Sequence, residues 1–226
     1  VNDQPSSLPS AASSSPATPP RAAGPNWGRL GFTLSILALG VSALTWVAQN
    51  HAEHEIKVVN LSLGHAVFES VFTDPLVQAV ERLSRKGILV VAAAGNMGIN
   101  PATRKPGYGG VGVPCNAPSA LCVGSLDTNH NATLADDKVA KSSSRGPTRF
   151  DLLAKPDLVA PGVKIVSLSS PESKLFKENQ HLRVFGRHQR PGAPAAYLTL
   201  SGTSMASPMA AGAAALEAHR ERLDAV

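Results

Sequence analysis

Two short apolar runs enclose a helical pattern in the first half of the chain. Residues 57–63 are rich in β-branched side chains, and residues 88–93 are continuously apolar, as in a strand covered on both faces. Between them, Asp74-Pro75 is a helix-start signal, and apolar residues then recur on one helical face: Leu76, Val77, Val80 and Leu83. Strand, helix and strand at this spacing predict a βαβ unit, and therefore a parallel sheet with a right-handed crossover.

The second half of the chain continues this pattern. Residues 120–124, 163–168 and 197–200 form short apolar runs that predict further strands. From Thr203 onward, a run of small residues predicts a buried helix at the centre of the domain, because alanine and glycine let neighbouring elements approach closely. The pattern as a whole indicates an α/β domain built on a mostly parallel sheet.

The first 50 residues differ in character from the rest. Residues 1–29 are dominated by proline, serine and alanine, so we interpret them as a disordered segment before a domain that spans 30–226. Residues 30–50 carry no charge and are long enough to span a bilayer. Six polar residues dilute this stretch and favour a buried crossover helix over a membrane span: Thr33, Ser35, Ser42, Thr45, Gln49 and Asn50.

Composition is that of a globular domain. The chain has 226 residues, of which 43% are hydrophobic, so it can bury a sizeable core. The net charge of +5 is mild, and no recognisable nucleic-acid-binding motif accompanies it, so a nucleic-acid partner is not expected. The densest basic cluster lies in residues 174–190, which we interpret as an irregular, solvated loop near a substrate cleft.

Two cysteines, Cys115 and Cys122, lie seven positions apart. This spacing is compatible with a small disulfide-closed loop in a secreted protein, and equally with a buried free thiol in the predicted strand. No histidine cluster accompanies the pair, so a zinc site is not predicted.

The chemistry of the chain is concentrated in Gly202-Thr203-Ser204-Met205-Ala206-Ser207-Pro208. A serine in the first turn of a helix points its hydroxyl at unpaired backbone N–H groups and at the positive end of the helix dipole. That environment suits a nucleophile whose attack creates an oxyanion. Taken alone, the segment is more typical of a serine that merely caps a helix.

The segment resembles the nucleophile motif of the subtilisin-like serine proteases, the subtilases, and other motifs of that family precede it in the expected order. They are Val58-Val59-Asn60-Leu61-Ser62-Leu63-Gly64, Val90-Val91-Ala92-Ala93-Ala94-Gly95-Asn96, Ser143-Ser144-Arg145-Gly146-Pro147 and Lys155-Pro156-Asp157-Leu158-Val159-Ala160-Pro161-Gly162. The resemblance covers about residues 35–220. It implies a three-layer α/β fold, incomplete in this chain, in which helices flank a mostly parallel sheet.

The resemblance also implies roles for single residues. Ser204 would attack the scissile carbonyl of a protein or peptide substrate and form an acyl-enzyme. The Ser204 N–H and the side-chain amide of Asn96 would stabilise the oxyanion. The chemistry requires no cofactor and no catalytic metal, whereas structural calcium stays open because subtilases often bind it. The resemblance also implies a secreted or extracellular location.

Two segments of the motifs are expected to hold the substrate. Ser62, Leu63 and Gly64 would lie at the cleft edge and pair with substrate backbone as an added strand. A facing wall of the first specificity pocket would be formed by three small residues: Ala93, Ala94 and Gly95.

Two members of the catalytic triad have no counterpart in this sequence. The family order is Asp, His and Ser, but the chain holds neither an Asp-Thr/Ser-Gly turn nor a His-Gly-Thr-His stretch. We interpret its histidines as surface or helix-terminal residues: His51, His54, His65, His130, His181, His188 and His219. The chain is therefore expected to be a fragment of a serine endopeptidase that by itself hydrolyses little or nothing.

A second interpretation is a degenerate subtilase that binds peptides or serves a structural role. An unrelated α/β hydrolase is disfavoured, because the segment around Ser204 lacks the second glycine of the Gly-x-Ser-x-Gly elbow. The presence of both Ser204 and Asn96 favours the endopeptidase.

Overall fold

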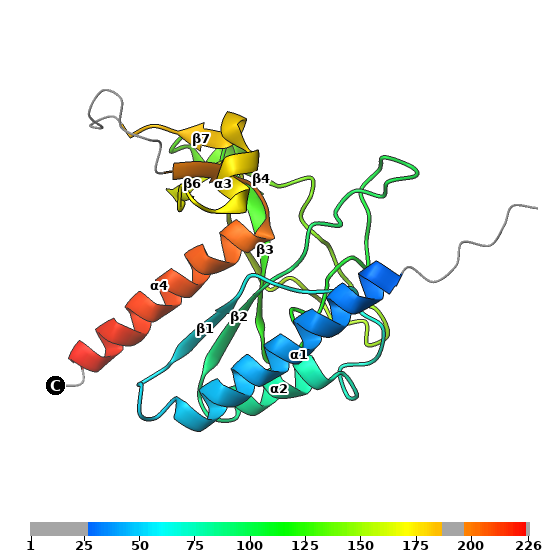
Figure 1. The fold of residues 1–226 in the computed structure, drawn as a ribbon, viewed down its shortest axis with the longest axis vertical. Coiled ribbons are helices and arrows are strands. Elements are labelled where there is room, and N and C mark those ends of the chain that lie inside the picture. The colour runs from blue at the N-terminus through cyan, green and yellow to red at the C-terminus, as the bar shows by residue number, and fades with distance from the viewer. Residues whose placement is uncertain (1–26, 187–196, 225–226) are drawn as a thin grey trace, which may run out of the picture.

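A parallel sheet forms the centre of the molecule in the computed structural model, which describes residues 27–186 and 197–224 (Figure 1). Strands β1 (Val58–Leu61), β2 (Leu89–Ala93), β3 (Leu121–Asp127) and β5 (Leu158–Pro161) pair in parallel in that order. The two-residue strand β4 (Lys138–Val139) pairs antiparallel with the end of β3. The predicted, mostly parallel sheet is confirmed.

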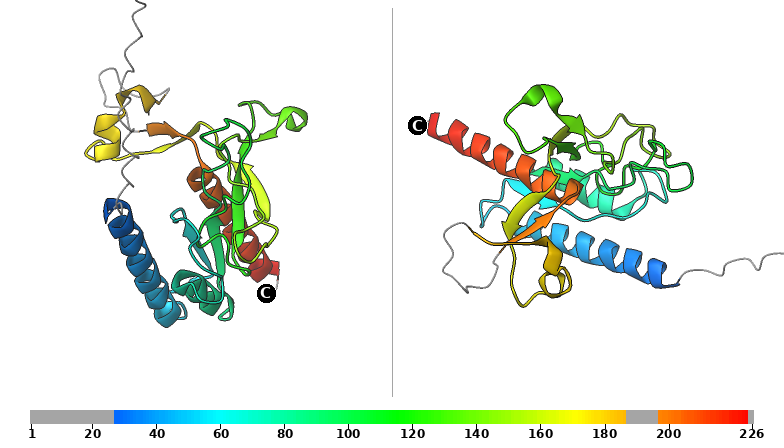
Figure 2. Two further views of the ribbon diagram at one scale, coloured as in Figure 1. Left: turned by 90° about the vertical axis from the view of Figure 1, so that its right-hand side faces the viewer. Right: turned by 90° about the horizontal axis from the view of Figure 1, so that it is seen from above.

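Helices cover both faces of this sheet. Helices α1 (Trp27–Asn50) and α2 (Pro75–Ser84) lie on one face, and α4 (Thr203–Asp224) lies on the other (Figures 1 and 2). The three-layer α/β architecture predicted from the sequence is therefore confirmed.

The central strand β2 explains why its sequence is continuously apolar. Val90 and Ala92 belong to the larger core, on the side of α1 and α2. Val91, between them, belongs to a smaller core with Ala206 and Ala211 of α4. Successive side chains of a strand point to opposite faces, so a strand with helices on both faces needs apolar residues at every position.

The βαβ unit β1-α2-β2 forms as predicted. Asp74 caps α2, since its carboxylate accepts from the N–H groups of Leu76 at 2.9 Å and Val77 at 3.1 Å. Pro75 occupies the first helical position, where no N–H partner is needed. The predicted apolar face of α2 is buried in the larger core.

Helix α1 is buried on one side only, which corrects the expectation of a buried helix. Its inner face contacts α2 through Gly40 and Leu44, whereas Leu39 is 72% exposed and Trp46 51% exposed. Within the described part of the chain, no helix is long and apolar enough to cross a membrane. Helix α1 begins at Trp27, inside the segment expected to be disordered, and residues 1–26 lie outside the described residues.

Helix α4 also departs from the expectation that it is buried. Ala206 and Ala211 pack against the sheet, but Met209 is 49% exposed and Leu216 is 74% exposed. A methyl group added at Gly212 would have no atom within 4 Å. The prediction assumed neighbours all around this helix, whereas among the described residues only the sheet-side face has them.

A second, smaller sheet lies beyond the start of α4. Strands β6 (Ile165–Leu168), β8 (Tyr197–Leu200) and β7 (Arg183–Val184) pair antiparallel in the order β6-β8-β7. Short helical turns accompany the sheets: α3 (Lys174–Glu178), η2 (Gln180–Leu182) and, before β4, η1 (Leu134–Asp136).

The stretch predicted to be an irregular basic loop is therefore partly ordered structure. Phe176 of α3 is buried beside Leu198 of β8. The guanidinium of Arg183 lies 4.3 Å from the Phe176 ring centroid and donates to the Phe176 carbonyl at 2.9 Å. A basic residue assigned to solvent thus holds this small core together, and Arg187 and Arg190 lie outside the described residues.

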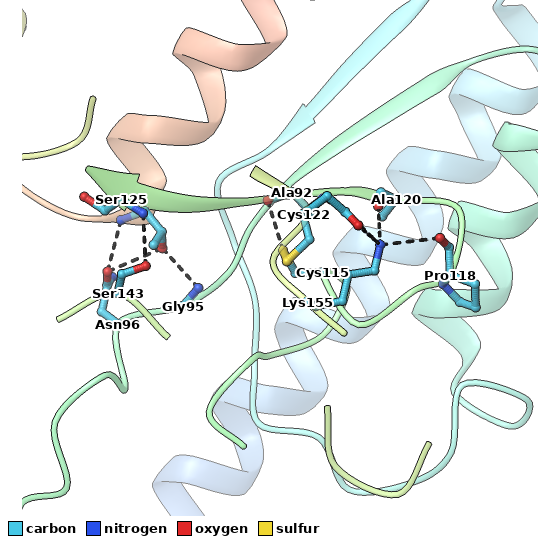
Figure 3. The surroundings of a disulfide bond; sticks show 12 residues. Ala92, Gly95, Asn96, Cys115, Pro118, Ala120, Cys122, Ser125, Ser143 and Lys155 are labelled. Carbon is cyan, nitrogen blue, oxygen red and sulfur yellow. Dashed lines mark hydrogen bonds and ion pairs between the residues drawn. A yellow bond between two sulfur atoms is a disulfide. The ribbon is translucent and has the colours of Figure 1, made fainter. Parts of the chain in front are cut away.

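The two cysteines form a disulfide, and the free-thiol alternative is wrong. Cys115 and Cys122 are both fully buried, with their Cα atoms 4.8 Å apart (Figure 3). The bridge joins Cys115 to Cys122 of β3 and closes a short loop at the start of that strand.

Candidate active site at the ends of strands β1 and β2

Three segments from distant parts of the chain meet at one edge of the sheet. Ser62 follows β1, Asn96 follows β2, and Ser204 is the second residue of α4. Because the carboxyl ends of parallel strands lie at the same edge of a sheet, the fold brings these residues together. The Ser204 hydroxyl donates to the Ser62 carbonyl at 3.2 Å, which joins the first segment to the third.

Asn96 is oriented by the start of α4. Its side-chain Oδ1 accepts from the N–H of Thr203 at 3.0 Å, and the Thr203 hydroxyl in turn accepts from the N–H of Gly95 at 3.0 Å. Since the oxygen end of the amide is engaged in this way, its Nδ2 end is left as a donor. Nδ2 has no hydrogen-bond partner among the described residues, and the side chain is exposed.

Gly202 permits this close approach. Its φ is +150°, and a methyl group added there would lie 3.3 Å from both Oδ1 and Nδ2 of Asn96. Any side chain at this position would crowd the amide. The turn that begins α4 is thus matched to the position of Asn96.

The hydroxyl of Ser62 compensates for a proline in α4. Pro208 has no N–H, so the carbonyl of Ser204, four residues earlier, lacks its usual helical partner. Ser62 Oγ donates to that carbonyl at 2.9 Å and lies 3.0 Å from Ser207 Oγ. Asn60 Nδ2 donates to the same hydroxyl at 2.9 Å. The family resemblance of the sequence implied a role for Ser62 in substrate binding and gave no sign of this contact.

The segment after Ser62 is bonded to the backbone around Val113. His65 and Val113 exchange backbone hydrogen bonds of 3.0 and 3.1 Å. A methyl group added at Gly64 would lie 2.4 Å from the Val113 carbonyl. Glycine is therefore required at position 64 by close backbone contact within the protein, independently of any substrate.

A cavity of about 640 Å³ opens between these walls. Most of the site residues expected from the sequence line it: Ser62, Leu63, Gly64, Ala93, Gly95, Asn96 and Ser204. Ala94 does not. It is fully buried, and its carbonyl accepts from the N–H of Gly112 at 3.1 Å, so it supports the wall from behind.

Sequence reasoning missed the opposite wall of the cavity. Residues 110–113 line it, and Arg149 and His65 line it as well. The one available signal was the glycine-rich run from Gly107 to Gly112, which is typical of backbone held close to another chain segment. Nothing in the sequence placed Arg149 at the cavity.

No general base accompanies Ser204 in the described part of the chain. None of the histidines within it hydrogen-bonds to the serine, and His188 lies outside it. His65 lines the cavity, but its Nδ1 is engaged with the Ala66 carbonyl at 2.7 Å. The described residues also contain no group of three or more histidine, cysteine or acidic side chains placed to hold a metal ion.

Comparisons with known proteins agree with this fold and these motifs. The family model of peptidase S8, the Subtilase family, matches residues 31–222. The chain is 38% identical over 186 residues to serine protease AprX of Bacillus subtilis, and 34% identical over 176 residues to subtilisin DY of Bacillus licheniformis. These alignments cover 81% and 78% of the chain. The chain belongs to the Subtilase family, the subtilisin-like serine proteases.

The chain spans less than half the length of these relatives. The alignments cover 38% of AprX and 46% of subtilisin DY. Among solved structures, the S41 psychrophilic protease superposes with a TM-score of 0.54 at 31% identity, over 78% of this chain and 47% of that one. What the chain resembles is therefore one part of a subtilisin-like protease.

Proposed function

We propose that residues 30–226 are part of the catalytic domain of a serine endopeptidase, with Ser204 as nucleophile and Asn96 as oxyanion-hole donor. Family membership supports peptide-bond hydrolysis as the reaction. The hydrogen bond from Thr203 N–H to Asn96 Oδ1 carries the assignment of Asn96, because it leaves the Nδ2 donor free at the cavity that Ser204 also lines.

In this mechanism Ser204 Oγ attacks the scissile carbonyl and forms an acyl-enzyme, with a tetrahedral intermediate on the way. As the second residue of α4, Ser204 has no helical partner for its own N–H, which can donate to the oxyanion. Asn96 Nδ2 donates a second hydrogen bond. The positive end of the α4 dipole adds to the stabilisation of this charge.

Protein or peptide substrates fit the cavity wall formed by residues 62–64. An extended peptide would add to this edge through main-chain hydrogen bonds, and the small side chains of Ala93 and Gly95 would face it across the cavity. Hydrolysis of this kind requires no cofactor. The Cys115–Cys122 disulfide supports a secreted or extracellular location, where such bonds persist.

Catalysis requires an imidazole that takes the proton of the Ser204 hydroxyl, together with a carboxylate that orients it. In the family the Asp and His precede the Ser in the sequence. We therefore propose that this chain by itself hydrolyses little or nothing, and that residues N-terminal to the matched region supply both groups.

The test is a fusion of residues 30–226 behind the part of AprX that precedes the matched region. We expect the 226-residue chain alone to hydrolyse a peptide p-nitroanilide barely above background, and the fusion to be active. Ser204→Ala should abolish that activity, and Asn96→Ala should lower kcat by about a hundred- to a thousand-fold, the usual loss for one oxyanion donor.

The alternative function is a catalytically inactive module that binds peptides or serves a structural role. The observation in its favour is that no histidine among the described residues reaches Ser204. A folded fusion that binds peptide but shows no Ser204-dependent hydrolysis would support this alternative. Ser204-dependent hydrolysis by the isolated chain would instead contradict the proposed inactivity.

A further inference from the structure

The cavity is lined by few charged side chains in the part of the chain that the structure describes. Among the described residues that line it, Arg149 is the single lysine, arginine, aspartate or glutamate. The other residues around it are mostly glycine, alanine, valine and serine. From the described residues, an occupant of this cavity therefore meets one positive charge and no negative charge.

The loop that carries Arg149 is anchored on both sides of it. Before it lies buried Thr148, whose N–H donates to the Leu153 carbonyl at 2.9 Å and whose carbonyl accepts from the N–H of Leu152 at 3.2 Å. The Thr148 hydroxyl also accepts from the N–H of Leu153 at 3.0 Å. After it, the carboxylate of Asp151 accepts from Ser70 Oγ and from the N–H of Val71. The backbone at Arg149 is thus held in place at the cavity.

The guanidinium itself is unengaged. It makes no hydrogen bond or ion pair within the described part of the chain. The carboxylate nearest to it in the sequence, that of Asp151 two residues later, is turned toward residues 70 and 71 by the bonds just described. A guanidinium with five donors and no protein acceptor is suited to a ligand carboxylate, which it binds through two parallel hydrogen bonds.

A second polar group of the cavity also lacks a partner. His65 lines the cavity, and its Nδ1 must carry the hydrogen, because the Ala66 carbonyl 2.7 Å away can only accept. Its Nε2 is buried and unpaired. With the hydrogen on Nδ1, Nε2 can only accept, so it gives a carboxylate no hydrogen bond, and among the described lining residues Arg149 is the charged donor that can bind one.

We propose that the cavity selects peptides with an aspartate or glutamate side chain close to the bond that faces Ser204, and that Arg149 is the residue that determines this specificity. This inference rests on the proposed function, since it places a peptide in the same cavity. It adds the chemical class of the substrate: acidic peptides are preferred over neutral and basic ones.

The test measures binding of fluorescent hexapeptides to the 226-residue chain by anisotropy at low salt. One glutamate is moved through an alanine-based sequence, and each peptide is paired with its glutamine counterpart. At one position we expect glutamate to bind about three- to ten-fold tighter than glutamine, with the difference shrinking at high salt. Arg149→Gln should abolish the difference, and Arg149→Glu should reverse it.

Arg82→Gln is the matched control, because it removes the same charge from an exposed position on α2 that does not line the cavity. It should leave the preference for glutamate unchanged. Equal binding of glutamate and glutamine peptides would overturn the role of Arg149 and leave the proposed peptide cleft intact. Failure of every peptide to bind would overturn both. A preference for glutamate that Arg149→Gln leaves unchanged would overturn the role of Arg149 alone.

Discussion

At the scale of single residues, Lys155 stands out because it is a buried charge with a complete set of partners. Its side chain is 6% exposed. The ammonium donates to the Ala120 carbonyl at 2.8 Å and to the Pro118 carbonyl at 3.4 Å (Figure 3). It also donates to the Asp157 carboxylate at 2.8 Å. The three donors of the ammonium thus meet two carbonyls and a carboxylate, and the disulfide loop is joined to the segment that leads into β5.

We predict that Lys155→Met lowers the free energy of unfolding by about 2–4 kcal/mol, because two carbonyls lose their donor and a partly buried carboxylate loses its cation and keeps only the Cys122 N–H. The control is Lys174→Met, which removes only an exposed pair with Glu178 at 3.7 Å and should cost less than about 0.5 kcal/mol. Urea denaturation measures both. If the two variants lost similar free energies of unfolding, the buried contacts of Lys155 would contribute no more to stability than an exposed ion pair does.

At the scale of elements, the first turn of α4 lacks one helical hydrogen bond, and a residue from outside the helix supplies a donor in its place. Pro208 removes the N–H that would bond the Ser204 carbonyl, and Ser62, from the segment after β1, supplies a hydroxyl instead. The same residue accepts from the Ser204 hydroxyl through its own carbonyl. The proposed nucleophile is therefore held from the β1 side by two contacts.

We predict that Ser62→Ala and Pro208→Ala are coupled. In the native sequence, Ser62→Ala leaves the Ser204 carbonyl unsatisfied and should cost about 1–2 kcal/mol of unfolding free energy. In the Pro208→Ala background, the restored N–H can bond that carbonyl, so the same change should cost about 1 kcal/mol less. A double-mutant cycle measured by denaturation checks this, and strictly additive effects would contradict it.

At the scale of the whole molecule, the two sheets have very unequal cores. The parallel sheet lies between the larger core of α1 and α2 and the smaller core of α4. The β6-β8-β7 sheet is supported by a cluster in which Phe176 and Leu198 are the buried residues. Local stability follows buried apolar contact, so the small sheet should open well before the large one.

We predict that the amides of β7 and β8 exchange with solvent through openings of lower free energy than those of β2 and β3. Native-state hydrogen exchange read by mass spectrometry measures this difference. Equal protection of the two sheets would show that they unfold as one cooperative unit.

Much of the fold followed from local patterns in the sequence. The Asp74-Pro75 start of α2, its buried face and the continuously apolar β2 were all predicted, because each depends on residues close together in the chain. The stretch 174–186 was not. Its short helix and strand depend on the packing of Phe176 against Leu198 and Arg183. No local pattern in the sequence predicts that packing.

The sequence by itself determined the order of motifs, and with it the family and the proposed nucleophile. Only the tertiary structure decided which distant groups meet: Ser62 with Ser204 across 142 positions, and Asn96 with Thr203 across 107. It likewise decided between the bridge and the free thiols at Cys115 and Cys122. It also decided which face of α4 is covered and placed Arg149 at the cavity. Periodicity and capping reflect neighbours within a few residues, whereas burial and long-range hydrogen bonds exist only once separate segments pack together.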